Sequence, residues 1–205
     1  MTHHHITAVL LAAGTGERFR ASGGGGKLLS LLPNGQVMAV QSLLNLKRCL
    51  GADGRSVVAV VRPEQAQLAS LLHDHGALVV KSDAAHRGMG ASLAAGLGRV
   101  AENSDVLIAL GDMPYVAPST LQAICHALAA GASIVQPCVE QRRGNPVGFS
   151  SRWLANLRTL NDDWGARHIL KEHQAEVLLL PTTDEGIFMD IDTLAALHRP
   201  ASTPR

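Results

Sequence analysis

The sequence predicts an α/β fold in which helices flank a mostly parallel β-sheet. Continuously apolar segments alternate along the chain with segments whose apolar residues repeat at helical spacing. Strands that are apolar on both faces are typical of parallel sheets, because helices cover both faces. Repeated strand–helix units also favour that architecture. In such sheets ligands bind beyond the carboxyl ends of the strands.

The expected strands are short apolar runs bounded by glycine, proline or polar residues. The first is interpreted as a buried strand and not as a signal peptide, because no basic segment precedes it and no cleavage site follows. In chain order the strands are Ile6–Ala13, Ser56–Val61, Leu78–Val80, Asp105–Leu110, Ser133–Pro137, Pro146–Phe149, Val177–Leu180 and Ile187–Ile191.

The expected helices carry apolar residues three or four positions apart. Gly51 ends the first helix, and the second opens after Pro63 and closes at Gly76, in keeping with the helix-stop role of glycine and the helix-start role of proline. In chain order the helices are Val37–Leu50, residues 63–76, Ala91–Ala101, Pro118–Ala130, Ser151–Leu160, Ala166–His173 and Thr193–His198.

Length and composition limit the possible functions. The 205 residues predict a single domain over residues 1–198 and a flexible polar tail at residues 199–205. A net charge of +1 and 3% aromatic residues disfavour nucleic acid as a partner, and no apolar run is long enough to cross a membrane. Cys49, Cys125 and Cys138 have no metal-binding spacing, so we expect buried thiols and a cytoplasmic protein.

A glycine-rich segment after the first strand is the first candidate site. Gly14 and Gly16 would let backbone N–H groups approach an anion, and Arg18 and Lys27 would add positive charge, a combination that suits a polyphosphate. The segment fails the dinucleotide fingerprint because bulky Phe19 stands where glycine or alanine is needed. It also fails the P-loop pattern, because residue 21 is alanine and residue 28 is leucine.

Two acidic segments could complete a phosphate site. Asp112 follows the fourth strand between Gly111 and Pro114, where a carboxylate could hold Mg²⁺ against phosphates. Asp190 and Asp192 would point to the same face if their segment were a strand, and one of them could be a second ligand. Alternatively, Asp192 or Thr193 caps the last helix.

Other loops at the expected strand ends could bind a substrate. Arg62 follows the second strand, and the small residues from Gly88 to Ser92 could lie over a base or ribose. The segments 142–149 and 161–167 are either ordinary loops or, through Arg167, part of a site for a second anionic substrate.

Taken together, these motifs resemble those of the molybdopterin nucleotidyltransferase-like family, and within it the molybdenum cofactor cytidylyltransferases. The resemblance spans nearly the whole chain and implies a Rossmann-like, glycosyltransferase-A-like fold. The matching residues, in family order, are Leu11-Ala12-Ala13-Gly14-x-Gly16-x-Arg18 with Lys27, Gly111-Asp112-Met113-Pro114, Gly144-Asn145-Pro146-Val147-Gly148-Phe149, Gly165-Ala166-Arg167 and Asp190-Ile191-Asp192-Thr193.

The resemblance implies that CTP and a molybdenum-bound pterin phosphate give a cytidylyl-linked cofactor and pyrophosphate. A molybdenum hydroxylase is the implied recipient. Arg18, Lys27 and Asp112 would be catalytic; Asp112 would hold Mg²⁺, or Mn²⁺, with Asp190 or Asp192 as second ligand. Asn145 and Arg167 would face the acceptor. The expected nucleotide-binding residues are Leu11, Ala12, Ala13, Gly14, Thr15, Gly16, Arg18, Lys27, Arg62, Gly88, Ser92 and Asp112.

The chain departs from the family pattern in one place. Arg20 stands near an expected glycine, and the segment from Ala21 to Gly26 lengthens the approach to Lys27. Alternatives within the enzyme class are GMP transfer to the same pterin and nucleotidyl transfer to a sugar or polyol phosphate. From another class, the chain could be a cofactor chaperone that catalyses nothing. The failed dinucleotide fingerprint makes a nicotinamide oxidoreductase the least favoured reading.

Overall fold

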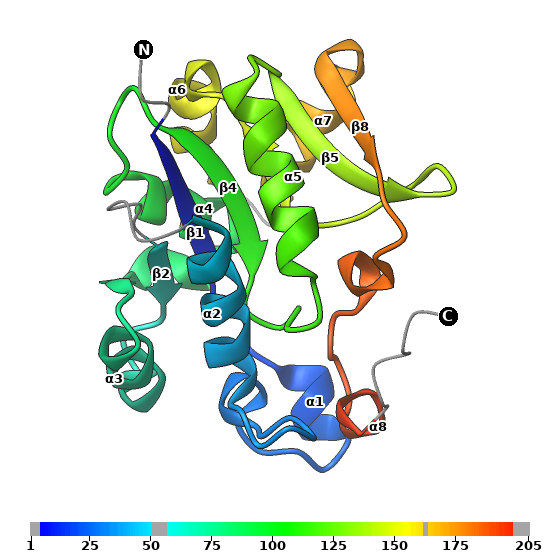
Figure 1. The fold of residues 1–205 in the computed structure, drawn as a ribbon. Coiled ribbons are helices and arrows are strands. Elements are labelled where there is room, and N and C mark those ends of the chain that lie inside the picture. Colours follow the sequence, from blue (N-terminus) through cyan, green and yellow to red (C-terminus); the bar gives the residue numbers. More distant parts are fainter. Residues whose placement is uncertain (1–4, 51–56, 162–163, 199–205) are drawn as a thin grey trace.

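A computed structural model describes residues 5–50, 57–161 and 164–198. Its centre is a mixed, mostly parallel sheet with helices on both faces (Figure 1). The strands follow the order β3-β2-β1-β4-β7-β5-β6, and β8 pairs with β5. Their bounds are Ile6–Leu11 (β1), Val57–Val61 (β2), Leu78–Lys81 (β3), Asp105–Leu110 (β4), Ile134–Val139 (β5), Arg142–Arg143 (β6), Val147–Phe149 (β7) and Val177–Pro181 (β8).

Strand β1 lies in the interior of the sheet, parallel to β2 on one side and to β4 on the other. All six of its residues are buried. Side chains alternate along a strand, so Ala8 and Leu10 pack into one core layer, and Val9 and Leu11 pack into a second layer on the opposite face. The continuously apolar sequence therefore follows from burial on both faces, as predicted.

The helices divide between these two layers. The first layer contains α2, α3 and α5, and the second contains α4, α6 and α7 (Figure 1). The helix bounds are Glu17–Ala21 (α1), Met38–Leu50 (α2), Ala66–Asp74 (α3), Met89–Leu97 (α4), Pro118–Ala129 (α5), Leu154–Arg158 (α6), Arg167–Glu172 (α7) and Leu194–Leu197 (α8). Short 3₁₀ turns occupy Lys27–Leu29 (η1), Asp83–Arg87 (η2), Ser151–Trp153 (η3), Gln174–Glu176 (η4) and Glu185–Phe188 (η5).

The sheet changes character beyond β4. Strand β7 runs antiparallel to both β4 and β5, whereas β8 runs parallel to β5. The carboxyl ends of β1, β2 and β4 therefore lie at one edge of the sheet, while the segments after residue 140 reach that edge through loops.

Most expected elements are present, with shifted ends. The strand expected at Ile187–Ile191 is wrong: residues 185–188 form the 3₁₀ turn η5. The side chain of Asp184 starts this turn by accepting a hydrogen bond from the backbone N–H of Gly186 at 2.9 Å. A Cβ at Gly186 would lie 2.2 Å from the Tyr115 carbonyl oxygen. The turn therefore packs closely against the loop that carries Tyr115, and this packing takes the place of strand pairing.

Two further differences concern single segments. The helix expected from Pro63 begins at Ala66, and the stretch 151–160 is split into η3 and α6. Thr193 caps α8, as one of the two expected caps, its hydroxyl accepting a hydrogen bond from the Ala196 N–H at 3.1 Å. Ser56, Gly51 and the expected tail at 199–205 lie outside the described residues.

Cys49, Cys125 and Cys138 are buried, as expected. No helix in the described part of the chain is long and apolar enough to cross a membrane.

Candidate active site

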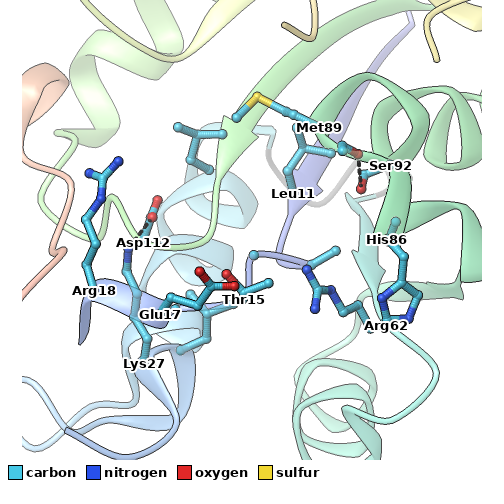
Figure 2. Close-up of a pocket in the computed structure, with 17 residues that line it drawn as sticks. Leu11, Thr15, Glu17, Arg18, Lys27, Arg62, His86, Met89, Ser92 and Asp112 are labelled. Carbon is cyan, nitrogen blue, oxygen red and sulfur yellow. Dashed lines mark hydrogen bonds and ion pairs between the residues drawn. The ribbon is translucent and has the colours of Figure 1, made fainter. Parts of the chain in front are cut away.

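A cavity of about 630 Å³ opens at the carboxyl ends of β1, β2 and β4 (Figure 2). Figure 2 shows Arg18, Lys27 and Asp112 on one side of it and Arg62 and His86 on the other. The lining residues are Leu11, Ala13, Gly14, Thr15, Gly16, Glu17, Arg18, Lys27, Leu28, Arg62, Ala85, His86, Gly88, Met89, Ser92, Leu110 and Asp112.

Eleven of the twelve residues expected to bind nucleotide line this cavity. Ala12 does not: it is fully buried beneath the loop, and its N–H donates to the Val60 carbonyl at 2.9 Å. Sequence reasoning missed six lining residues. Their nearness in sequence to predicted positions is a signal that could have found them. The six residues are Glu17, Leu28, Ala85, His86, Met89 and Leu110.

The loop between β1 and α1 has the backbone geometry that its glycines permit. Gly16 has φ +65°, a left-handed conformation that glycine adopts without steric cost, and it begins α1. A Cβ there would also lie 3.1 Å from the Lys27 Cβ. At Gly14 a Cβ would meet nothing within 4 Å, so this residue exposes its backbone to the cavity. Backbone amides at such a loop are suited to binding phosphate oxygens.

Lys27 is the centre of a charge cluster drawn from three distant segments. Its ammonium donates to Asp112 Oδ2 at 2.7 Å and to Asp192 Oδ1 at 2.5 Å. Arg18 donates to the other oxygen of Asp192 at 2.8 Å. The Lys27 side chain is only 10% exposed, whereas that of Arg18 is 82% exposed. The lengthened segment before Lys27 therefore still delivers its ammonium to the cavity.

The cluster shifts the pKa of two members. Burial lowers the pKa of Lys27, but attraction to Asp112 and Asp192 outweighs burial and holds that pKa above its ordinary 10.5. The Lys27 hydrogen bond, aided by Arg18, holds the pKa of Asp192 below 3.8 against the opposing effect of burial. Lys27 is therefore cationic and Asp192 anionic throughout the neutral range.

Asp190 does not join this cluster. The two aspartates would share a face only in an extended strand, and their segment is not one. Asp190 is exposed, whereas Asp192 reaches Lys27 and Arg18. The expectation of two carboxylates on one strand face is therefore wrong, and Asp192 is the acidic residue of this pair at the site.

The donor set of the cluster fits a divalent cation. Asp112 and Asp192 each direct a carboxylate oxygen at the same Lys27 nitrogen, so both oxygens converge on a point already occupied by a positive charge. Mg²⁺ and Mn²⁺ prefer oxygen ligands, and Mg²⁺ typically takes one or two carboxylates together with substrate phosphates. The described residues contain no group of three or more His, Cys, Asp or Glu side chains that could hold a metal ion, so this pair of carboxylates would need ligands from the substrate.

The loop that carries Asp112 is held by side chains that sequence reasoning missed. Ser42 of α2 donates to the Gly111 carbonyl at 3.1 Å. Asn45, one turn further along α2, donates to the carbonyls of Pro114 at 2.9 Å and Val116 at 3.2 Å. Both side chains are buried. The available signal was that Ser42 and Asn45 are polar residues among the apolar residues of an amphipathic helix.

Arg62 faces the cavity opposite the charge cluster, with its side chain 17% exposed. Its Nε is buried and has no acceptor among the described residues, and its guanidinium lies 3.9 Å from Glu64. A buried donor without a partner is costly, so Arg62 is suited to donating a hydrogen bond to an oxygen or nitrogen of a ligand. The Ser92 hydroxyl, unlike the Nε of Arg62, has a partner within the protein: it donates a hydrogen bond to the Gly88 carbonyl at 2.9 Å.

A second, smaller cavity of about 70 Å³ contains both residues expected at the acceptor, Asn145 and Arg167. It shares Leu11, Met89 and Leu110 with the larger cavity, so the two adjoin. Asn145 is anchored by a hydrogen bond from its N–H to the Ile187 carbonyl at 3.0 Å, and Arg167 begins α7. The structure thus brings the two residues to the same place, although 22 positions separate them.

Comparison with known proteins agrees with this geometry. The model of the MobA-like NTP transferase domain matches residues 8–177. Nicotine blue oxidoreductase from Paenarthrobacter nicotinovorans is 31% identical, with 95% of each chain covered. The crystal structure of Rv0371c from Mycobacterium tuberculosis H37Rv has a TM-score of 0.73 and 28% identity, with 96% of each chain covered. A structure of the same mycobacterial protein in complex with manganese has a TM-score of 0.71 and 24% identity, with 94% of this chain and 95% of that one covered.

A nucleotidyl transferase from Methanothermobacter thermautotroptrophicus shares the fold, with a TM-score of 0.78, 20% identity and 94% of each chain covered. The family match covers most of the chain. The protein therefore belongs to the MobA-like NTP transferase family and is a nucleotidyltransferase.

Proposed function

We propose that the protein transfers CMP from CTP to the terminal phosphate of molybdenum-bound molybdopterin and releases pyrophosphate. The observation that carries this proposal is the cluster of Lys27, Arg18, Asp112 and Asp192 beside the glycine loop, next to a second cavity with Arg167 and Asn145. One cavity suits a triphosphate and its neighbour suits a phosphorylated acceptor. The preference for cytidine rests on family analogy: Ala12 and Ala13 precede Gly14 at the place where the guanylyl branch of the family tends to carry a further glycine.

The chain's residues position and neutralise the reactants. The loop amides from Gly14 to Gly16 bind phosphate oxygens, and Arg62 contacts the base or ribose. Lys27 leaves the carboxylates and faces the triphosphate when nucleotide binds, with Arg18 at the exposed end. Arg167 and Asn145 hold the acceptor phosphate. Such positioning and charge neutralisation account for catalysis without a covalent nucleophile.

The reaction is an in-line displacement at the α-phosphorus. An oxygen of the acceptor phosphate, already ionised at neutral pH, forms the new P–O bond. The bond from the α-phosphorus to the bridging oxygen breaks, and pyrophosphate leaves with that electron pair. A divalent cation held by Asp112 and Asp192 would neutralise phosphate charge. The manganese complex of Rv0371c supports a divalent cation, and we propose Mg²⁺, with Mn²⁺ as an alternative.

The proposal includes a cytoplasmic location and a molybdenum hydroxylase that receives the product. The test is pyrophosphate release with Mg²⁺ and molybdenum-loaded pterin phosphate, in parallel reactions with CTP, GTP, ATP and UTP. We expect CTP to be preferred by at least tenfold. Preference for GTP would move the protein to guanylyl transfer. Pyrophosphate release only with a sugar or polyol phosphate would show that the acceptor is not the pterin. No pyrophosphate release from folded protein with a verified acceptor would favour a role as a cofactor carrier.

An oxidoreductase is a second candidate, favoured by one observation: the relative that is 31% identical over 95% of the chain is named nicotine blue oxidoreductase. The test is the change in absorbance of nicotine blue with NADH or NADPH as reductant. Turnover that persists in Asp112→Ala would indicate chemistry independent of the charge cluster and would favour this candidate. No reduction by the native protein would exclude it.

A further inference from the structure

The second cavity is lined by two aromatic side chains, Phe149 and Trp164, that do not line the larger cavity. Of the five large apolar side chains that remain exposed in the described part of the chain, Met89 and Trp164 both border this cavity. Trp164 is 59% exposed and Met89 is 39% exposed. Exposed apolar groups that gather at one cavity are typical of a binding surface, whereas singly scattered ones are ordinary.

The backbone beside Trp164 holds this side of the cavity together. Gly165 has φ +58°, and a Cβ there would lie 3.2 Å from the Met89 sulfur, so the chain packs directly on Met89. The Trp164 ring lies 5.6 Å from the ring of His168, centroid to centroid, at a tilt of 51°. Trp164 therefore lies between two contacts on its C-terminal side, the packing of Gly165 on Met89 and its own ring contact with His168.

Met89 lies at the junction of the two cavities, since it lines both. Arg167, three residues after Trp164, supplies a positive charge at the same cavity. A ligand that placed its phosphate between Arg167 and the nucleotide site would extend its remaining part over Trp164. Apolar residues dominate this cavity, so that part finds ring and methyl groups rather than the many polar partners that a polyol chain needs.

We propose that Trp164, assisted by Met89, is the residue that selects an acceptor with a flat aromatic ring over an acceptor with a flexible polyol chain. A cavity of about 70 Å³ is too small to enclose a bicyclic ring, so the ring lies across its mouth and stacks on Trp164. This inference rests on the proposed function, because it assigns the second cavity to the acceptor.

The test compares two acceptor probes that share a phosphate and differ in the ring: a pterin with a phosphorylated side chain and ribitol 5-phosphate. Binding is measured by calorimetry for the native protein, Trp164→Ala, Trp164→Phe and Leu178→Ala. Leu178 is 47% exposed on β8 and does not line the cavity, so its variant is a matched control. Circular dichroism establishes that each variant is folded.

We expect Trp164→Ala to weaken binding of the pterin about tenfold, the scale of one lost stacking contact. Trp164→Phe should restore binding to within about threefold, and Leu178→Ala should bind as the native protein does. The KM for CTP should be unchanged in all variants. Pterin should also quench tryptophan emission in the native protein but not in Trp164→Phe, where only the buried Trp153 remains.

Three results would overturn the inference: native-like pterin binding by Trp164→Ala, equal weakening of both probes, or ribitol 5-phosphate binding the native protein at least as tightly as the pterin. Binding is measured without turnover, so the two proposals fail separately. If pterin binding depends on Trp164 but no pyrophosphate is released, the role of Trp164 in stacking on the ring is supported and the proposed transferase activity is rejected. If nucleotidyl transfer to the pterin occurs and is unchanged in Trp164→Ala, the transferase activity is supported and the role of Trp164 is rejected.

Discussion

The two cavities differ in both chemistry and construction. The larger one lies at the ends of three parallel strands and carries charged side chains, with Lys27 between two carboxylates. The smaller one lies beside β7 and α7, is mostly apolar, and contains Asn145, Arg167 and Trp164. Parallel strands bring their carboxyl ends to one edge automatically, whereas the second cavity depends on loops folding back onto that edge.

This difference explains why charge is concentrated at one place. Phosphoryl transfer builds up charge at the nucleotide, and stabilising that charge needs fixed donors and cations. Recognition of a phosphorylated acceptor needs a complementary surface and one cationic contact to its phosphate. Substitutions in the first cavity should therefore reduce turnover, and substitutions in the second should raise the KM for the acceptor.

The largest expected effect is at Asp112. Asp112→Ala removes one carboxylate from the charge cluster, and we expect turnover to fall about 10²- to 10³-fold. The measurement is pyrophosphate release at saturating CTP and acceptor. Asp190→Ala, which changes an exposed carboxylate in the same part of the molecule as Asp192, is the control and should retain activity within about twofold. Near-normal turnover in Asp112→Ala would remove it from the catalytic machinery.

The second cavity, which we propose binds the acceptor, provides the contrasting experiment. Arg167→Ala should raise the KM for the acceptor phosphate about tenfold, because one charge-assisted contact is lost. The KM for CTP should stay unchanged. Steady-state kinetics with each substrate varied in turn gives both values. An equal rise in the two KM values would show that the cavities do not act separately.

A third experiment addresses the support beneath the charged cavity. Asn45→Ala leaves the carbonyls of Pro114 and Val116 without their side-chain donor in a buried loop. We expect about 1–3 kcal/mol of lost stability, measured by urea unfolding, together with lower turnover because Asp112 lies in the same loop. Asn156→Ala, at an exposed position on α6, is the control. Unchanged stability in Asn45→Ala would show that the loop holds its shape without α2.

The smallest expected effect is the pH dependence of the Asp192 contacts. The folded pKa of Asp192 is below 3.8, so its stabilising contribution is present above pH 3.8 and is lost as pH falls through the folded value. Its side chain is a third exposed, so solvent screening limits the contribution to about 1 kcal/mol or less. Unfolding free energies of native protein and Asp192→Asn should converge below pH 3.8. A difference that persists at lower pH would contradict this origin.

Sequence reasoning was more successful in the first region than in the second. The strand Asp105–Leu110 was predicted to the residue, and Gly14, Lys27 and Asp112 were expected at the same edge because each follows a buried parallel strand or its loop. The segment 187–191 was misread as a strand because most of its residues are apolar. Its buried residues Ile187 and Ile191 instead pack into the core from a 3₁₀ turn and from the irregular segment that follows it. Neither Ser42 nor Asn45 was anticipated, because their partners are backbone carbonyls about 70 positions away.

The sequence by itself determined the alternation of strands and helices, the edge at which ligands bind and the residue types that can hold phosphate. These properties follow from local periodicity and from the shared direction of parallel strands. Only the tertiary structure decided that Asp192 rather than Asp190 meets Lys27, and that Met89 joins the two cavities. Such pairings depend on how non-repetitive segments pack against one another, and no local pattern encodes a contact between residues 165 positions apart.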